Sequence, residues 1–405
     1  MHNFYKYLDY LDDQRALLCE LLTKWADINS FSHNLAGLDQ LTSALRKEFS
    51  VFPAEIEEVE LGSHDILDSE GELKKIPLGK ALRIRKHIPG KPQVLLCCHM
   101  DTVFPLNSPF QRSVRLNEDT LQGPGVTDAK GGLLVMFKAL EAFEAGPWAE
   151  ELGWEVIINP DEEIGSPGSR LLLEQAAHAN HIGLVFEPSL SDGTLVGSRK
   201  GSGNFVAIVR GRSAHAGREP DVGRNAVNSM AEFIVELNSL PPGALGLTVN
   251  VGYVEGGGPV NVVPDRAVCK FNVRITDQED QKFFEDHLEV TEQKINRTDG
   301  ISIEIHGGFS RPPKVLDSKT LRLLEQIGAA GRDLGLSLEW RFSGGACDGN
   351  NLAALGLPTV DSLGATGGGI HSSNEYVLLH SIVQRAKLTA LFLMKLASVA
   401  ATAAH

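Results

Sequence analysis

The chain has 405 residues, 42% hydrophobic and 22% charged, so it is long enough for two or three domains and has the composition of a soluble globular protein. Its formal net charge of −14 argues against a nucleic-acid partner, which would need a basic face, but leaves open an anionic small-molecule substrate. Because no run approaches the ~18 apolar residues of a membrane span, and the first residues lack a secretory pattern, we expect no membrane partner.

The first half of the chain alternates between helical and strand patterns. Apolar residues at spacings of three and four predict helices over 9–50 (two helices, the second over 38–49), 131–144 and 169–180. Short apolar runs, typical of buried parallel strands, lie at 94–98, 156–158 and 184–186. This alternation predicts an α/β fold with a mostly parallel central sheet flanked by helices.

The five cysteines are odd in number and have no zinc-ribbon spacing. Cys97 and Cys98 are adjacent on a predicted buried strand, so they should point to opposite faces of the sheet as small core residues. This pattern predicts a reduced, cytoplasmic protein.

The pattern changes near residue 200, after which Gly201-Ser202-Gly203 is predicted to be a flexible segment. The next elements follow the order strand, helix, strand, strand, helix, strand, over 204–210, 224–240, 247–254, 266–275, 279–294 and 301–306. This is the split βαβ order of a ferredoxin-like α+β unit. The first pattern then returns, with helices over 318–334, 348–355 and 376–397 and a strand over 337–341. We predict a discontinuous catalytic domain, 1–199 and 313–405, interrupted by a lid domain, 200–312.

Histidine and acidic residues directly follow the predicted parallel strands. His99 and Asp101 follow the first strand, Glu162 and Glu163 the second, and Glu187 the third. In open α/β sheets the ligand crevice lies outside the carboxyl ends of the strands, so we expect these side chains to meet at one edge. Because His99 and Asp101 are two residues apart, one can bind a metal while the other orients it.

Asp128 and His371 complete the candidate set; Asp128 lies in a glycine-rich segment just before a predicted helix. Imidazole and carboxylate donors without a thiolate suit catalytic zinc, with manganese or cobalt as alternatives. The adjacent carboxylates of Glu162 and Glu163 are costly unless a cation neutralises them or one takes a proton. Because the set exceeds what one site needs, it predicts two divalent metals about 3.5–4 Å apart. Taken singly, each residue would more often be structural or merely solvated.

Eight segments together resemble the co-catalytic zinc exopeptidase and deacylase family, which includes glutamate carboxypeptidase, acetylornithine deacetylase, succinyl-diaminopimelate desuccinylase, aminoacylase and carnosine-type dipeptidases. They lie in family order at 99–103, 123–132, 161–166, 186–188, 213–217, 261–264, 344–348 and 371–372. The runs at 161–169 and 186–189 look closest to the glutamate carboxypeptidase branch. The resemblance implies a zinc-exopeptidase-like fold with an inserted lid, through which a homodimer forms.

The resemblance also implies how the metal ligands are shared. Asp128 would bridge both metals, His99 and Glu187 would complete one site, and Glu163 and His371 would complete the other. Relatives commonly have a cis peptide bond after the bridging aspartate. Alanine at position 129 departs from the residues usual there, so the sequence leaves this bond open.

Three further residues are expected, by resemblance, to act in catalysis. Glu162 would be the general base, and Asp101 would orient His99. His215 would help to stabilise the oxyanion, in many relatives at the active site of the partner subunit. Without the family context, His215 would be read as an ordinary turn histidine.

Asn261 and Arg274 resemble lid residues that hold a substrate carboxylate, and Arg311 is a further candidate because arginine binds carboxylates bidentately. We therefore expect a glutamate-carboxypeptidase-like hydrolase that cleaves an amide or peptide bond next to a free carboxylate. The alternatives are an N-acyl-amino-acid deacylase or a dipeptidase of the same family. A single-metal aminopeptidase fits the arginines poorly, and a catalytically silent binding homologue fits the intact ligand set poorly.

Overall fold

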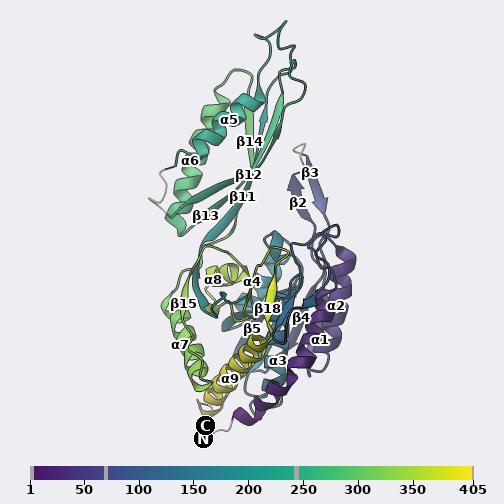
Figure 1. Ribbon diagram of the computed structural model, residues 1–405. Coiled ribbons are helices and arrows are strands. Elements are labelled where there is room, and N and C mark those ends of the chain that lie inside the picture. Colours follow the sequence, from purple (N-terminus) through teal and green to yellow (C-terminus); the bar gives the residue numbers. More distant parts are fainter. Residues whose placement is uncertain (1–3, 68–71, 241–245, 404–405) are drawn as a thin grey trace.

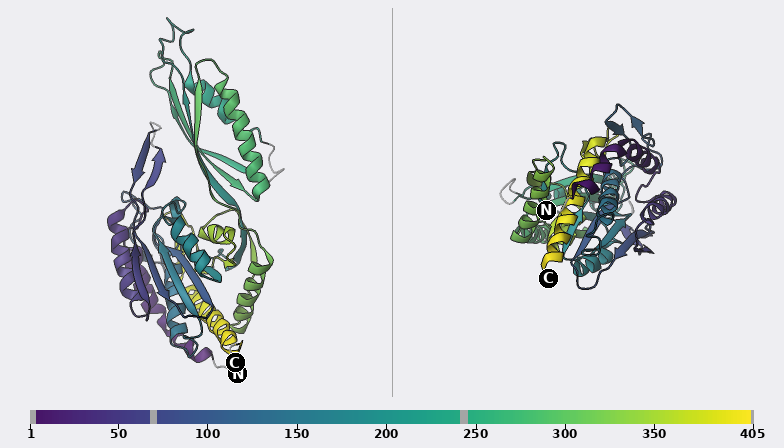
Figure 2. Two further views of the ribbon diagram at one scale, coloured as in Figure 1. Left: turned by 180° about the vertical axis from the view of Figure 1, so that it is seen from behind. Right: turned by 90° about the horizontal axis from the view of Figure 1, so that it is seen from below.

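The computed structural model describes residues 4–67, 72–240 and 246–403 (Figure 1). Figures 1 and 2 show a larger part, with both chain ends at one extremity, and a smaller part that projects from the opposite extremity. The smaller part begins with β11 (Gly201–Arg210) and ends with β14 (Ser302–Arg311), and we call it the lid.

The larger part is built on a six-stranded sheet with the order β1-β4-β8-β5-β9-β16. Four strands run parallel to their neighbours: β8 (Gly153–Asn159), β5 (Gln93–His99), β9 (Ile182–Val185) and β16 (Thr359–Val360). The sheet continues with two antiparallel pairings, made by β4 (Ala81–Lys86) and β1 (Glu55–Val59). All residues of β5 and β8 are buried, as expected for central strands of a sheet covered on both faces. The predicted fold class is confirmed.

Helices cover both faces of this sheet. One core contains residues of α1 (Arg15–Ala26), α2 (Leu35–Phe49), α3 (Lys130–Glu144), α7 (Ser318–Asp333) and α9 (Leu379–Ala403). The core on the other face contains residues of α4 (Arg170–Ala179) and α8 (Asp348–Ala354). Cys98 belongs to the first core and Cys97 to the second, so the two side chains point to opposite faces as predicted. Among the described residues, no helix has the length and apolar character to cross a bilayer.

The structure corrects the predicted helix over 376–397. Its first residues form strand β18 (Tyr376–Leu378), which pairs with β7 (Thr120–Gln122) and β17 (Gly367–Gly368), so α9 begins only at Leu379. The strand predicted over 337–341 lies at β15 (Trp340–Ser343), where it pairs with β10 (Leu195–Arg199). Short elements that were not predicted include β2 (His64–Leu67), β3 (Leu73–Ile76), β6 (Val114–Arg115) and the 3-10 helix η1 (Tyr5–Tyr7). The first residues of the helical region predicted over 9–50 form a 3-10 helix, η2 (Asp9–Gln14).

The lid is a four-stranded antiparallel sheet with helices on one face. The strand order is β12-β13-β11-β14, with β12 (Thr248–Gly256) at one edge and β13 (Arg266–Ile275) inside. Helices α5 (Ala226–Leu237) and α6 (Gln278–Asn296) share one hydrophobic core with the sheet. The residues 201–203, predicted to be flexible, instead begin β11. A Cβ at Gly201 would lie 2.8 Å from the carbonyl oxygen of Arg311, so glycine permits this close strand approach.

The lid is joined to the larger part by two chain segments that pair with each other. Arg199 and Lys314 exchange two backbone hydrogen bonds of 3.0 Å. The side-chain amide of Asn350 donates to the carbonyl oxygens of Lys200, at 3.0 Å, and Pro312, at 2.8 Å. The junction is therefore a hydrogen-bonded pair of chain segments rather than two independent linkers.

Close packing of α3 on the sheet generates a stability prediction. A Cβ on Gly132 would overlap the carbonyl oxygen of Phe186, whereas a Cβ on Gly328, inside α7, would meet only the Arg332 side chain at 3.6 Å. We expect Gly132→Ala to lower the free energy of unfolding by about 1–3 kcal/mol through overpacking. Gly328→Ala, the matched control, should raise it by roughly 0.5–1 kcal/mol through helix propensity.

Urea denaturation followed by circular dichroism measures both changes. Equal effects of the two alanines would contradict close contact between α3 and the segment after β9.

Candidate metal centre

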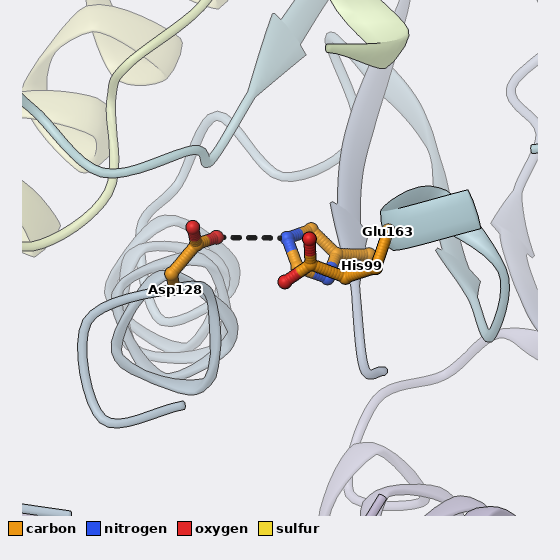
Figure 3. Close-up of side chains that lie close together, drawn as sticks. All are labelled: His99, Asp128 and Glu163. Atoms are coloured by element: carbon orange, nitrogen blue, oxygen red, sulfur yellow. Dashed lines mark hydrogen bonds and ion pairs between the residues drawn. The ribbon is translucent and has the colours of Figure 1, made fainter. Parts of the chain in front are cut away.

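His99 is the last residue of β5, and it faces Asp128 (Figure 3). The His99 Nε2 lies 3.0 Å from Asp128 Oδ1, while its Nδ1 lies 3.0 Å from the Asp101 carbonyl oxygen and 3.4 Å from Asp101 Oδ1. Asp101 also accepts hydrogen bonds from the backbone N–H groups of Glu162 and Glu163, both at 3.1 Å. One buried carboxylate thus ties the end of β5 to the turn after β8.

Asp128 lies in the loop before α3, and a buried carboxylate holds that loop in place. Glu375 accepts hydrogen bonds from the backbone N–H groups of Gly125, at 3.1 Å, Thr127, at 2.9 Å, and Asp128, at 3.0 Å. The Asp128–Ala129 peptide bond, which the sequence left open, is cis. Glu375 therefore fixes the backbone from which the Asp128 side chain projects.

The two oxygens of Asp128 face different histidines. Oδ1 lies beside His99, and Oδ2 lies 3.3 Å from His371 Nε2. The same His371 nitrogen lies 3.2 Å from Glu163 Oε2, on the 3-10 turn η3 (Glu162–Ile164) that follows β8. His371 itself has φ 60°, the left-handed region, next to Gly369 at φ 66°.

Glu187, just beyond β9, and Glu162 approach His99 from another side. Glu187 Oε1 lies 3.8 Å from His99 Nε2. Two sets of donor atoms each lie within 4.8 Å of one another: His99, Asp128 and Glu163 form one, and His99, Glu162 and Glu187 form the other. The structure therefore brings together all five predicted metal ligands and the predicted base.

Burying this many carboxylates is electrostatically costly. Burial is the largest cause that raises the pKa of Glu187, to about 7, and the charge of Asp128 acts in the same direction. Burial likewise raises the pKa values of Glu162 and Glu163. A cation among these groups would remove the cost. The donors are nitrogen and oxygen only, and the split contacts of Asp128 fit two divalent cations that share it.

Arg311 does not stand free in the cleft. Its Nη2 lies 2.8 Å from Glu162 Oε1 and 2.9 Å from the Glu162 carbonyl oxygen, while its Nη1 lies 2.9 Å from Asp348 Oδ1. Only 4% of Arg311 is exposed. Its charge is therefore already compensated by two carboxylates, a position that the sequence did not reveal.

A cleft of about 350 Å³ opens over the cluster, between the larger part and the near end of the lid. Its lining includes Asp128, Glu162, Glu163, Glu187 and His371. The lid contributes a further set: Ser202, Asn204, Asn272, Arg274 and Arg311. Arg274 thus lies where a substrate held at the cluster would meet it.

His215 and Asn261 lie elsewhere. Both are exposed, and they are close to each other, since Ala216 N–H donates to the Asn261 carbonyl oxygen at 2.9 Å. His215 follows the end of β11 at Arg210, and Asn261 precedes Arg266, which pairs with Arg210. The cleft touches β11 at Ser202 and Asn204, roughly 20 Å from Arg210 along the strand. Within one chain, neither residue reaches the cluster.

Three supporting residues escaped the sequence analysis as functional groups. Glu375 follows His371 closely but carries no pattern of its own, and Asn272 precedes Arg274 by two residues on the same strand. Asp348 lies in the matching segment 344–348, and it accepts a hydrogen bond from Asn159 at 2.8 Å besides its pair with Arg311. The alternation of β13 could have indicated Asn272, because residues two apart share a face.

Fold and site together define a metal-dependent hydrolase of amide bonds, and comparisons with known proteins specify its family. The family model for peptidase family M20/M25/M40 matches residues 95–395. Carboxypeptidase G2 of Pseudomonas sp. (strain RS-16) is 30% identical over 315 residues, which cover 76% of this chain and 74% of that protein. A succinyl-diaminopimelate desuccinylase of Verminephrobacter eiseniae is 27% identical over 293 residues, 68% of this chain and 70% of that protein.

Solved structures agree in fold. A tripeptidase from Staphylococcus aureus has a TM-score of 0.75 at 23% identity and covers 95% of this chain and 99% of its own. An M20 family metallo-carboxypeptidase from Sulfolobus solfataricus has a TM-score of 0.73 at 18% identity and covers 94% and 99%. The chain belongs to peptidase family M20/M25/M40, as its resemblance implied.

The contacts of Glu375 predict its importance for metal binding. Glu375→Leu leaves three buried backbone N–H groups without acceptors, which should cost on the order of 3 kcal/mol or more and release the Asp128 loop. Glu375→Gln keeps one acceptor oxygen and should lose much less. We expect the leucine variant to retain less zinc after dialysis than the glutamine variant, measured by elemental analysis. Equal, full zinc contents in both variants would contradict this role.

Proposed function

We propose that the chain binds two divalent cations and hydrolyses an amide or peptide bond next to a free carboxylate, in the manner of a glutamate carboxypeptidase. Zinc is the first choice, with cobalt or manganese as alternatives. The main support for the proposal is that one carboxylate oxygen of Asp128 lies beside His99 and the other beside His371, in a cleft that Arg274 also lines. The similarity to carboxypeptidase G2 supports the carboxypeptidase reading, and a dinuclear metal-binding peptidase among the structural relatives, at 15% identity, has the same fold.

In this proposal Asp128 would be shared by the cations, with His99 and Glu187 completing one site and Glu163 and His371 completing the other. When bound, the cations would polarise the scissile carbonyl and lower the pKa of a shared water. Asp101 contacts Nδ1 of His99 and so orients the ring with Nε2 toward Asp128, where Nε2 would be available to a bound cation.

Glu162 is proposed as the general base. It takes a proton from the attacking water and passes it to the departing amine nitrogen. Its carboxylate lies in the cleft and is held by Arg311 through Oε1, while Asp101 accepts from its backbone N–H. These contacts fix the position of the base before substrate arrives.

Substrate recognition falls to the inserted residues 200–312, which we propose to act as a lid and dimerisation domain. Arg274 and Asn261 would hold the substrate carboxylate, whereas Arg311, the further candidate, is already paired with Glu162 and Asp348. Because His215 and Asn261 lie beyond the end of the lid sheet that is remote from the cleft of their own chain, they fit the active site of a partner subunit in a homodimer. There His215 would donate a hydrogen bond to the developing oxyanion.

A deacylase of N-acyl amino acids, or a dipeptidase, is the second candidate, favoured by the similarity to a desuccinylase. N-acyl-glutamates, other N-acyl amino acids and dipeptides, assayed with the metal-loaded enzyme, separate the candidates by kcat/KM. Tight binding without turnover of any compound would favour a silent binding protein instead.

Replacing the proposed base tests the reaction directly. Glu162→Gln keeps the size of the side chain but cannot accept the water proton, so kcat should fall by about 100-fold or more. Elemental analysis must accompany the assay, because a lost metal would have the same effect. A variant that keeps its metals and most of its turnover would remove Glu162 from this role.

Mixed dimers test whether His215 acts across subunits. Glu162→Gln and His215→Ala should each be nearly inactive alone. When the two are co-expressed with different tags, a mixed dimer has one complete site, so the mixture should recover about a quarter of wild-type activity. No recovery in purified mixed dimers would place His215 at its own chain's site or outside catalysis.

A further inference from the structure

The open face of the lid sheet directs polar side chains of β13 toward the cleft. Phe271, Val273 and Ile275 are buried in the core shared with α5 and α6. The alternate residues, Asn272 and Arg274, are half-buried on the opposite face, and both line the cleft. The period of a strand thus places an amide directly beside the guanidinium proposed to hold the substrate carboxylate.

The amide of Asn272 is fixed in one orientation. Its Nδ2 donates to the Gly203 carbonyl oxygen, at 3.0 Å, to Ser202 Oγ, at 3.0 Å, and to Asn204 Oδ1, at 2.8 Å. A carbonyl oxygen can only accept, so the NH₂ group must face β11. The Asn272 oxygen therefore faces Arg274, and it accepts from Arg274 Nε at 2.8 Å.

This bond uses one edge of the Arg274 guanidinium and leaves the other available. In the described part of the chain, neither Nη of Arg274 has a hydrogen-bond or ion-pair partner. Arg311 is the opposite case, since Glu162 and Asp348 compensate its charge. Burial lowers the pKa of Arg274 and the like charge of Arg311 adds to the effect, while the charge of Glu162 acts in the opposite direction.

We propose that Asn272 is a positioning residue, which aims the two Nη groups of Arg274 into the cleft so that they bind a carboxylate end-on. The inference rests on the proposed function and deepens it, because it identifies what fixes the carboxylate site. An arginine side chain has several rotatable bonds, so anchoring Nε removes freedom that substrate binding would otherwise have to remove.

The neutrality of Asn272 is part of the proposal. An aspartate at this position could accept the same hydrogen bond from Nε, but its charge would compensate Arg274 and weaken the attraction for a substrate carboxylate. A neutral acceptor orients the guanidinium and leaves its positive charge for the ligand.

Asn272→Leu, Asn272→Asp and the control Asn250→Leu test this role in the metal-loaded enzyme. Asn250 lies directly opposite Asn272 on β12, is exposed, and makes no hydrogen bond with Arg274 in the described residues. We expect Asn272→Leu to raise KM for an N-acyl-glutamate by roughly 10- to 100-fold, as the loss of a hydrogen bond to a charged group implies. Its kcat should stay within about twofold of wild type, because the reacting groups are untouched.

Two comparisons separate positioning from a structural effect. KM for the corresponding substrate with its carboxylates converted to amides should be the same in wild type and Asn272→Leu, and Asn250→Leu should change neither substrate. Asn272→Asp should also raise KM for the carboxylate substrate. An unchanged KM in Asn272→Leu would overturn the positioning role, an unchanged KM in Asn272→Asp would overturn the argument from neutrality, and equal losses on both substrates would indicate a structural defect instead.

Binding of free L-glutamate, measured by calorimetry, keeps this test independent of turnover. We expect Asn272→Leu to weaken glutamate binding by a factor similar to its rise in KM. If the wild-type enzyme hydrolysed none of the carboxylate substrates, the proposed function would fail, whereas the calorimetric comparison would still decide the role of Asn272; equal affinities in the two proteins would overturn it.

Discussion

The repulsion among four buried carboxylates constrains the whole candidate metal centre. Asp128, Glu162, Glu163 and Glu187 converge outside the carboxyl ends of parallel strands, where burial raises the pKa values of the three glutamates. Such a cluster is costly unless surrounding groups hold it in place and either cations or bound protons offset its charge. Asp101, Glu375 and Arg311 supply that support through backbone N–H groups and ion pairs, so the chain fixes its donors before any ligand binds.

The sequence predicted the parts of this site that local pattern determines. Strands 94–98, 156–158 and 184–186 read clearly as buried, and parallel strands end at a common edge, so His99, Glu163 and Glu187 could be expected together. The supporting contacts depend on residues far apart in the chain. Residues Tyr376–Leu378 pair with Thr120–Gln122, but their local sequence resembles the start of a helix. Likewise, nothing in the sequence near Arg311 indicates that it pairs with Glu162.

The two arginines at the cleft illustrate how surroundings divide similar side chains between tasks. Arg311 is buried, and the carboxylates of Glu162 and Asp348 compensate its charge. Arg274 donates only to the neutral amide of Asn272, so its two Nη groups are available to a ligand. Residue type alone suggested the same role for both. Their different partners assign one to holding the proposed base and the other to meeting the substrate.

The hydrogen-bonded junction between the larger part and the lid bears on whether the lid could be inserted or removed as a unit. Since Arg199 and Lys314 form an antiparallel hydrogen-bonded pair, the chain leaves the larger part for the lid and returns to it at points only about 5.5 Å apart. Such closely spaced ends allow a module to be spliced into a host without stretching either one. The lid nevertheless contributes to the chemistry of the larger part, because its last strand, β14, places Arg311 in contact with Glu162. Removing the lid would leave an unfilled space beside Glu162. The connection would therefore allow the lid to be exchanged, but the loss of Arg311 would change the active site.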